Sequence, residues 1–131
     1  MKILVVDDEK DIQPLFEQRF RKEIRNGEMN FEFAYSGEDA LNYLNNNKHE
    51  AVLILSDINM PGMSGLELLD RIKKEHDQPP PFVMMITAYG DAENHSRAME
   101  LGADDFITKP VNFKELKEKI SDFTGKKTNN E

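Results

Sequence analysis

Short apolar runs alternate with longer amphipathic stretches along the whole chain. Runs 2–6 and 51–56 are continuously apolar apart from their end residues, which is typical of strands buried on both faces of a parallel sheet. Residues 31–35 alternate between apolar and polar side chains, which favours a half-buried strand at a sheet edge. Two further runs, 82–86 and 105–108, complete a set of five predicted strands.

Between these runs, apolar residues recur every three or four positions, which is the period of an amphipathic helix. The first predicted helix spans residues 9–26 and ends at the stop signal Asn26-Gly27. The other four predicted helices begin after residues that can cap a helix N-terminus, namely Ser36, Ser64, Asp91 and Asn112. The last helix is predicted to end near Phe123. The pattern therefore predicts one domain over residues 1–123 and a polar tail over 124–131.

Five strands that alternate with five helices indicate an α/β fold, with a parallel sheet between two layers of helices. In such folds, functional groups gather at the carboxyl ends of the strands. Asp7 and Asp8 follow the first strand, and Asp57 follows the third. Thr87 follows the fourth strand and Lys109 the fifth. We expect these five side chains to converge on one site.

Three aspartates that lie close together destabilise the folded protein through charge repulsion unless something offsets their charge. Two like charges about 4 Å apart repel by roughly 4 kcal/mol at an effective dielectric near 20. Converging carboxylates therefore need a cation, a proton or distance, and Mg²⁺ is a divalent ion that prefers oxygen ligands. A carboxylate nucleophile, a divalent ion, a hydroxyl and an ammonium together can hold a phosphoryl group, whose oxygens carry negative charge.

Composition narrows the function classes. The 131 residues carry a formal net charge of −8, which argues against direct nucleic-acid binding through a basic surface. The chain has no cysteine, which excludes disulfides and thiolate metal sites and fits a reducing, cytoplasmic location. No apolar run approaches the roughly 20 residues of a membrane span, so we expect no contact with a membrane.

Five segments in order resemble the response-regulator receiver domain of two-component signalling, in the superfamily of the chemotaxis regulators. The resemblance covers essentially the whole chain, and each segment lies at or beside a predicted strand end. The segments are Val5-Val6-Asp7-Asp8-Glu9, Asp57-Ile58-Asn59-Met60-Pro61-Gly62-Met63-Ser64-Gly65, Ile86-Thr87-Ala88, Gly102-Ala103-Asp104-Asp105-Phe106 and Thr108-Lys109-Pro110.

This resemblance implies a flavodoxin-like sheet with strand order 2-1-3-4-5. It implies that Asp57 accepts a phosphoryl group from a phosphohistidine. Asp8, Asp57 and the backbone carbonyl of Asn59 would bind Mg²⁺ directly, and Asp7 would act through a metal-bound water.

The resemblance also assigns roles around the phosphoryl group. Lys109 would pair with it and Thr87 would donate a hydrogen bond to it. Phe106 would be the aromatic switch that turns inward on activation. The Lys109–Pro110 peptide bond would be cis. Tyr89 would line the route of attacking water and slow self-hydrolysis.

The partners implied are a sensor histidine kinase or a phosphotransfer protein, and an unidentified downstream protein or output domain. Such a receiver catalyses its own phosphorylation and dephosphorylation and is not a multiple-turnover enzyme. The partner would dock on the face made by helix 91–101, strand 105–108 and helix 112–123. We expect a monomer or a phosphorylation-dependent dimer, acting alone or as part of a longer regulator.

Two alternatives stay open at this point. A haloacid-dehalogenase-type phosphatase also uses an aspartyl-phosphate with Thr, Lys and Mg²⁺, but its nucleophile comes early in the chain, in an Asp-x-Asp motif. A receiver-like docking module that is never phosphorylated is the other alternative. His49, His76 and His95 share no ligand spacing, so we expect them to be solvent-exposed and without a catalytic role.

Overall fold

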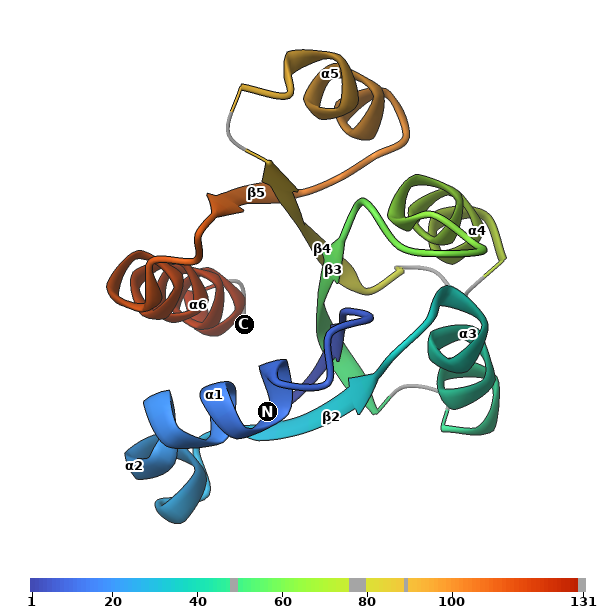
Figure 1. Cartoon of the computed structure of the whole chain (residues 1–131). Helices are drawn as coiled ribbons and strands as arrows, with labels where there is room; N and C mark the ends of the chain where they lie inside the picture. Colours follow the sequence, from blue (N-terminus) through green and yellow to red (C-terminus); the bar gives the residue numbers. More distant parts are fainter. Residues whose placement is uncertain (48–49, 76–79, 89, 130–131) are drawn as a thin grey trace.

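Five parallel strands form one sheet in the order β2-β1-β3-β4-β5, as predicted (Figure 1). The computed structural model describes residues 1–47, 50–75, 80–88 and 90–129. The strands are β1 (Lys2–Val6), β2 (Asn30–Ala34), β3 (Ala51–Asp57), β4 (Phe82–Ala88) and β5 (Asp105–Lys109). The helices are α1 (Ile12–Arg19), α2 (Arg21–Arg25), α3 (Gly37–Asn46), α4 (Gly65–Glu75), α5 (Ala92–Glu100) and α6 (Phe113–Asn129).

The helices cover both faces of the sheet and enclose two apolar cores. Helices α3, α4 and α5 lie on one face, and α1, α2 and α6 lie on the other (Figure 1). Successive residues of a strand point to opposite faces. Leu4 and Val6 therefore belong to the core under α3, α4 and α5, whereas Ile3 and Val5 belong to the core under α1 and α6. This division explains why the central strands are continuously apolar.

The core under α1 and α6 is rich in aromatic rings. Phe16 lies in α1 and Phe20 follows the C-terminal end of this helix, and their ring centroids are 5.7 Å apart. Phe16 contacts Phe113 of α6 at 5.2 Å, and Phe20 contacts Phe31 of β2 at 5.0 Å. The cluster joins the first helix, the edge strand β2 and the last helix into one packed face.

The predicted helix caps are confirmed. The side-chain oxygens of Ser36, Ser64, Asp91 and Asn112 each accept a hydrogen bond from the backbone N–H three residues later. Each bond satisfies one of the N–H groups that a helix N-terminus leaves without an intrahelical partner. These caps fix where α3, α4, α5 and α6 begin.

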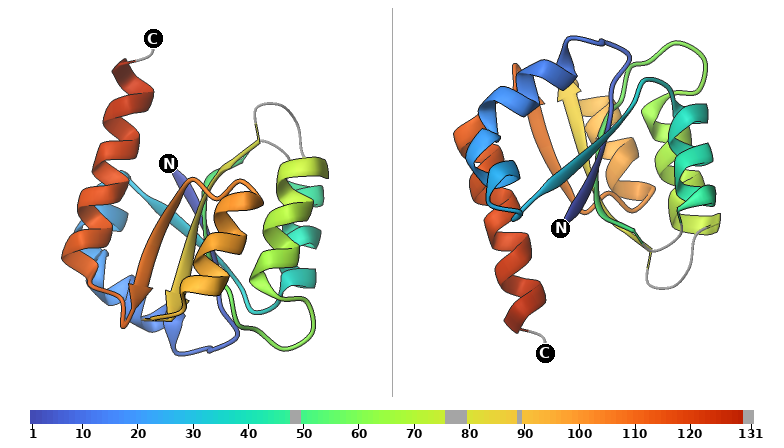
Figure 2. Two further views of the ribbon diagram at one scale, coloured as in Figure 1. Left: turned by 90° about the horizontal axis from the view of Figure 1, so that it is seen from above. Right: turned by 90° about the horizontal axis from the view of Figure 1, so that it is seen from below.

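The helices differ from the prediction in three places, the first of which is that α1 begins at Ile12 and not at residue 9. The single helix expected over residues 9–26 is wrong, because Phe20 adopts a non-helical conformation (φ −109°, ψ 23°) that separates α1 from α2. Phe20 is completely buried there, so packing in the aromatic cluster outweighs helical continuity. The last helix continues to Asn129 instead of ending near Phe123, and its last turns extend past the neighbouring elements (Figure 2).

No helix in the described part of the chain is both long and apolar enough to cross a lipid bilayer.

Candidate functional site

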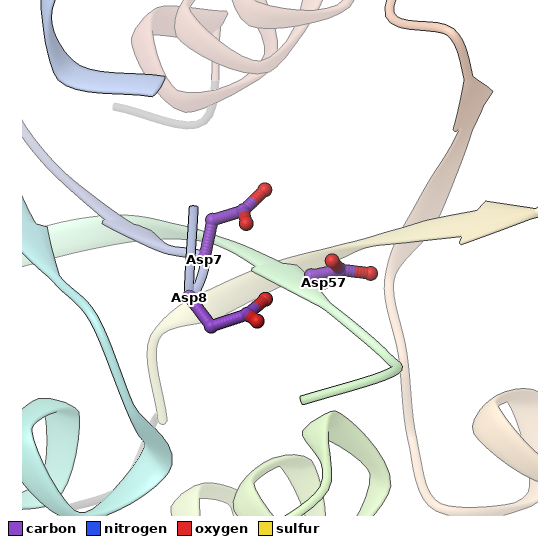
Figure 3. Close-up of side chains that lie close together, drawn as sticks. All are labelled: Asp7, Asp8 and Asp57. Carbon is purple, nitrogen blue, oxygen red and sulfur yellow. The ribbon is translucent and has the colours of Figure 1, made fainter. Parts of the chain in front are cut away.

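Three carboxylates converge at the carboxyl ends of β1 and β3. Asp7, Asp8 and Asp57 each offer an oxygen atom, and these atoms lie within 4.8 Å of one another. Asp7 and Asp8 reach from the end of β1 toward the end of β3, where Asp57 stands (Figure 3). Asp7 is 1% exposed and Asp57 is 6% exposed, whereas Asp8 is open to solvent. The cluster is therefore a buried negative site with one open side.

Backbone contacts hold Asp57 at this point. The N–H of Ile58 donates to the carbonyl of Ile86 at 3.2 Å, so the end of β3 stays tied to β4. The N–H of Gly65 donates to the carbonyl of Ile58 at 2.8 Å, which folds the start of α4 back toward Asp57. A Cβ atom on Gly65 would lie 2.0 Å from the Asp57 carbonyl oxygen, so only glycine permits this approach.

Lys109 reaches the cluster from the end of β5. Its Nζ lies 2.8 Å from Oδ2 of Asp57 and 3.7 Å from Oδ2 of Asp7. Burial lowers the pKa of the Lys109 ammonium, but the hydrogen bond to Asp57 and the charges of Asp57 and Asp7 raise this pKa by more. The pKa of Lys109 therefore lies above its ordinary value, and the side chain remains a cation at neutral pH. The Lys109–Pro110 peptide bond is cis.

The pKa of the Asp7 carboxyl lies above its ordinary value. Burial is the main cause that raises the pKa of this carboxyl, and the charge of Asp57 adds to the effect. The backbone N–H of Glu9, which donates to Asp7 Oδ1 at 2.9 Å, and the ammonium of Lys109 oppose the rise. The net direction is upward, so the folded protein holds this charge at some cost when no cation is bound.

Asn59 and Thr87 complete the set of predicted site residues. The N–H of Asn59 lies 3.4 Å from Oδ1 of Asp57, which places the Asn59 backbone beside the carboxylate. Thr87 is 4% exposed near the end of β4. Among the described residues, no hydrogen bond joins the Thr87 hydroxyl to Asp57 or Lys109. Thr87 thus lies at the same edge of the sheet, buried but without a hydrogen bond to these charged groups.

Phe106 of β5 is half-buried and packs against the core under α3, α4 and α5. The expectation that His95 is solvent-exposed is wrong, because His95 is also half-buried and stacks on the Phe106 ring. The sequence held one signal for this contact, since His95 lies three residues before the buried Ala98 of α5 and shares its helix face. His49, His76 and Tyr89 lie outside the described residues.

Comparison of the sequence with models of known protein families identifies the family of this chain. The sequence profile of the response regulator receiver domain matches residues 3–121. The chain belongs to the response regulator receiver domain family. It is therefore a module of two-component signalling, which favours this class over a haloacid-dehalogenase-type phosphatase. Receiver domains in general are signalling modules that interact with histidine kinases or phosphotransfer proteins and with output domains.

Solved receiver structures share this fold over nearly their whole length. A response regulator receiver domain protein from Clostridium thermocellum is 29% identical, with a TM-score of 0.82 over 97% of this chain and 96% of that one. The receiver domain of NtrX from Brucella abortus is 36% identical, with a TM-score of 0.76 over 91% and 94% of the two chains. The chemotaxis protein CheY4 from Vibrio cholerae is 25% identical, with a TM-score of 0.74 over 92% and 95%.

Proposed function

We propose that this receiver domain accepts a phosphoryl group on the carboxylate of Asp57. Phosphorylation then changes the conformation of the face made by α5, β5 and α6, to which a downstream partner binds. One observation carries the proposal. The Asp57 carboxylate stands at a strand end, 2.8 Å from the Lys109 ammonium and within 4.8 Å of the Asp7 and Asp8 oxygens. A structural aspartate would not need two further carboxylates beside it, whereas a phosphoryl-transfer site needs this set of charges.

The donor atoms fit Mg²⁺. They are hard carboxylate oxygens, and Asp8 leaves one side of the cluster open to solvent for the ion's remaining waters. Asp8, Asp57 and the backbone carbonyl of Asn59 would hold the ion directly, and Asp7 would act through a bound water. When bound, Mg²⁺ would neutralise negative charge on the phosphoryl oxygens.

The chemistry is a transfer between two protein side chains. An oxygen of Asp57 attacks the phosphorus of a partner's phosphohistidine, an O–P bond forms and the P–N bond breaks. The electron pair of the broken bond stays on the imidazole nitrogen. Lys109 stays protonated and pairs with a phosphoryl oxygen, which offsets the roughly −1.5 to −2 charge that the group carries.

The Thr87 hydroxyl would respond to the new charge. A hydrogen bond to an ionised group is about twice as strong as a neutral one, so the hydroxyl is drawn toward the phosphoryl group. That movement leaves space beside β4, into which the Phe106 ring rotates. The surface that changes is the face made by α5, β5 and α6, where we expect the downstream partner to dock.

The wider role follows from this chemistry. The phosphoryl donor would be a sensor histidine kinase or a phosphotransfer protein in the cytoplasm. The domain would catalyse its own phosphorylation and dephosphorylation at Asp57 and would not be a multiple-turnover enzyme. Residues 1–123 would form the receiver, with 124–131 as a polar extension of it. The domain would act as a monomer or as a dimer that forms on phosphorylation.

Phosphorylation by acetyl phosphate with Mg²⁺ tests the proposal. Wild-type protein should gain the mass of one phosphoryl group, mapped to Asp57 by peptide mass spectrometry, and Asp57→Asn should gain none. Asp70→Asn is the matched control, because Asp70 is a carboxylate on α4 that pairs with Lys74 at 3.1 Å. Absence of labelling on wild-type protein, both by acetyl phosphate and by histidine kinases, would instead indicate a docking module that is never phosphorylated.

A further inference from the structure

His95 on α5 and Phe106 on β5 form a stacked pair of rings. Their centroids lie 3.8 Å apart and their planes are inclined by 28°, so the contact joins ring faces. Both side chains are half-buried. Neither ring has a part in holding the phosphoryl group, and the proposed function assigns a role to Phe106 but none to His95 or to the stack.

The sheet register places Phe106 beside the moving part of the proposed switch. Met85 pairs with Phe106 and Thr87 pairs with Thr108 across β4 and β5. Side chains alternate along a strand, so Thr87, Met85 and Phe106 lie on the same face of the sheet. Thr87 lies two residues beyond Met85, the residue of β4 that pairs with Phe106. The Phe106 backbone is fixed in the sheet, so this residue changes position by rotating its side chain.

The position of His95 is tied to the end of β4. The N–H of Asp91 donates to the carbonyl of Ala88 at 3.2 Å, and the two Asp91 carboxylate oxygens accept from the backbone N–H and side-chain Nδ2 of Asn94 at 3.2 and 2.6 Å. Ala98, one turn beyond His95, is completely buried against the sheet. The N-terminus of α5 is therefore held by hydrogen bonds, and this fixes the position from which the His95 imidazole contacts Phe106.

We propose that His95 is a positioning residue that holds the Phe106 ring in its resting place and so sets how readily the face of α5, β5 and α6 changes. The inference deepens the proposed function, since rotation of Phe106 toward Thr87 is part of it. That rotation separates the two ring faces. A stacked aromatic pair shifts an equilibrium by roughly two- to tenfold beyond its buried area, so His95 lowers the population of the rotated state by that factor.

Side-chain rotamer populations of Phe106, measured by NMR in unphosphorylated protein, test this role. His95→Leu keeps an apolar side chain on a helix-forming residue and removes the aromatic face, so it should raise the minor Phe106 rotamer roughly two- to tenfold. His95→Phe keeps a ring and should restore the wild-type population. Met99→Ala is the control on the same helix, because Met99 is 60% exposed and should leave Phe106 unchanged. Equal Phe106 populations in wild-type protein and His95→Leu would overturn the proposal.

A second measurement needs no substitution at His95. The imidazole protons of His95 should show an upfield ring-current shift that disappears in Phe106→Leu. If the shift is absent in wild-type protein, or persists in Phe106→Leu, then the stack does not form in solution and the proposal is wrong. Both experiments use unphosphorylated protein, so their outcome is separate from the labelling of Asp57 that tests the proposed function.

Discussion

At the scale of single residues, Asp7 is the group whose charge opposes folding. Burial and the neighbouring Asp57 carboxylate raise the pKa of Asp7 above its ordinary value. Asp7→Asn removes the charge but keeps an oxygen that can accept from the Glu9 N–H. Without divalent cations, this variant should be more stable than wild-type protein, with a melting temperature higher by about 4 °C for each kcal/mol gained.

The effect of Asp7→Asn should depend on pH in a defined direction. Because the folded-state pKa of Asp7 is raised, the folded protein binds more protons than the unfolded chain just above the unfolded value, and stability falls as pH rises through this window. The stability gap between the variant and wild-type protein should therefore widen from acidic pH toward the folded-state pKa and stay constant above it. Thermal melts in EDTA across this range measure the gap, and a gap that narrows with rising pH would contradict the argument.

Gly65 sets the closest backbone approach at the site. An added Cβ would lie 2.0 Å from the Asp57 carbonyl oxygen and 2.7 Å from the Ile58 Cα, and both are backbone atoms. Gly65→Ala should therefore lose about 3 kcal/mol, the upper end of the usual cost of overpacking. Urea denaturation monitored by circular dichroism gives the change in the free energy of unfolding.

Gly27→Ala is the matched control for Gly65. Gly27 has a positive φ of 75° but no atom within 4 Å of an added Cβ, so the variant carries backbone strain without a clash. It should lose only about 1–2 kcal/mol. A loss at Gly65 no larger than that at Gly27 would show that α4 shifts at little cost.

Sequence reasoning located the chemical residues, but it could not supply the His95–Phe106 stack or the position of the Thr87 hydroxyl. Asp7, Asp8, Asp57, Thr87 and Lys109 could be placed at one edge of the sheet because strand ends are visible in the apolar pattern. The stack of His95 on Phe106 could not, since it depends on the rotation of α5 about its axis. The distance between the Thr87 hydroxyl and Asp57 likewise depends on a rotamer that no periodicity encodes.

At the scale of secondary-structure elements, α5 is held less firmly by apolar packing than α3 and α4, which cover the same face of the sheet. Its one fully buried residue is Ala98, whereas α3 buries Ala40, Leu41 and Leu44. The Asp91 cap is therefore a larger share of what holds α5 in place. Asp91→Ala should cost about 1 kcal/mol and should increase amide hydrogen exchange selectively along α5.

Ser36→Ala removes the corresponding cap from α3 and serves as the comparison. It should cost a similar free energy of unfolding, because each cap satisfies one backbone N–H. Its effect on exchange within α3 should be smaller, since that helix keeps its buried leucines. Equal increases in local exchange in the two helices would show that packing does not distinguish them.

The sequence pattern did not predict all the ends of the helices, and the break between α1 and α2 is the clearest case. Ile12, Phe16, Phe20 and Ile24 continue one stripe at a spacing of four across the break between α1 and α2, so the pattern holds no signal for it. The break arises because Phe20 packs against Phe31 and Phe113, which are distant in sequence. The parallel sheet could be predicted from the alternation of strands and helices, and its strand order from the resemblance to receivers.

At the scale of the whole molecule, the carboxylate cluster couples stability to divalent cations. An ion that binds only the folded state stabilises it by mass action, by about 1.4 kcal/mol when its concentration is ten times the dissociation constant. Mg²⁺ should therefore raise the melting temperature of wild-type protein and fail to raise that of Asp8→Asn. Differential scanning fluorimetry with and without Mg²⁺ makes the comparison, with Asp70→Asn as the control that keeps the response. An unchanged wild-type melting temperature at millimolar Mg²⁺ would count against the site.

The aromatic cluster has a consequence for how the chain is made. Phe16 and Phe20 are synthesised long before Phe113, yet the Phe113 ring of α6 packs against both of them. Until α6 leaves the ribosome, one face of the nascent sheet keeps its phenyl rings in water, while the opposite face can already be covered by α3, α4 and α5. The incomplete chain thus has one covered and one exposed face of the sheet. The exposed face, which α6 covers last, is the one that a chaperone would need to shield.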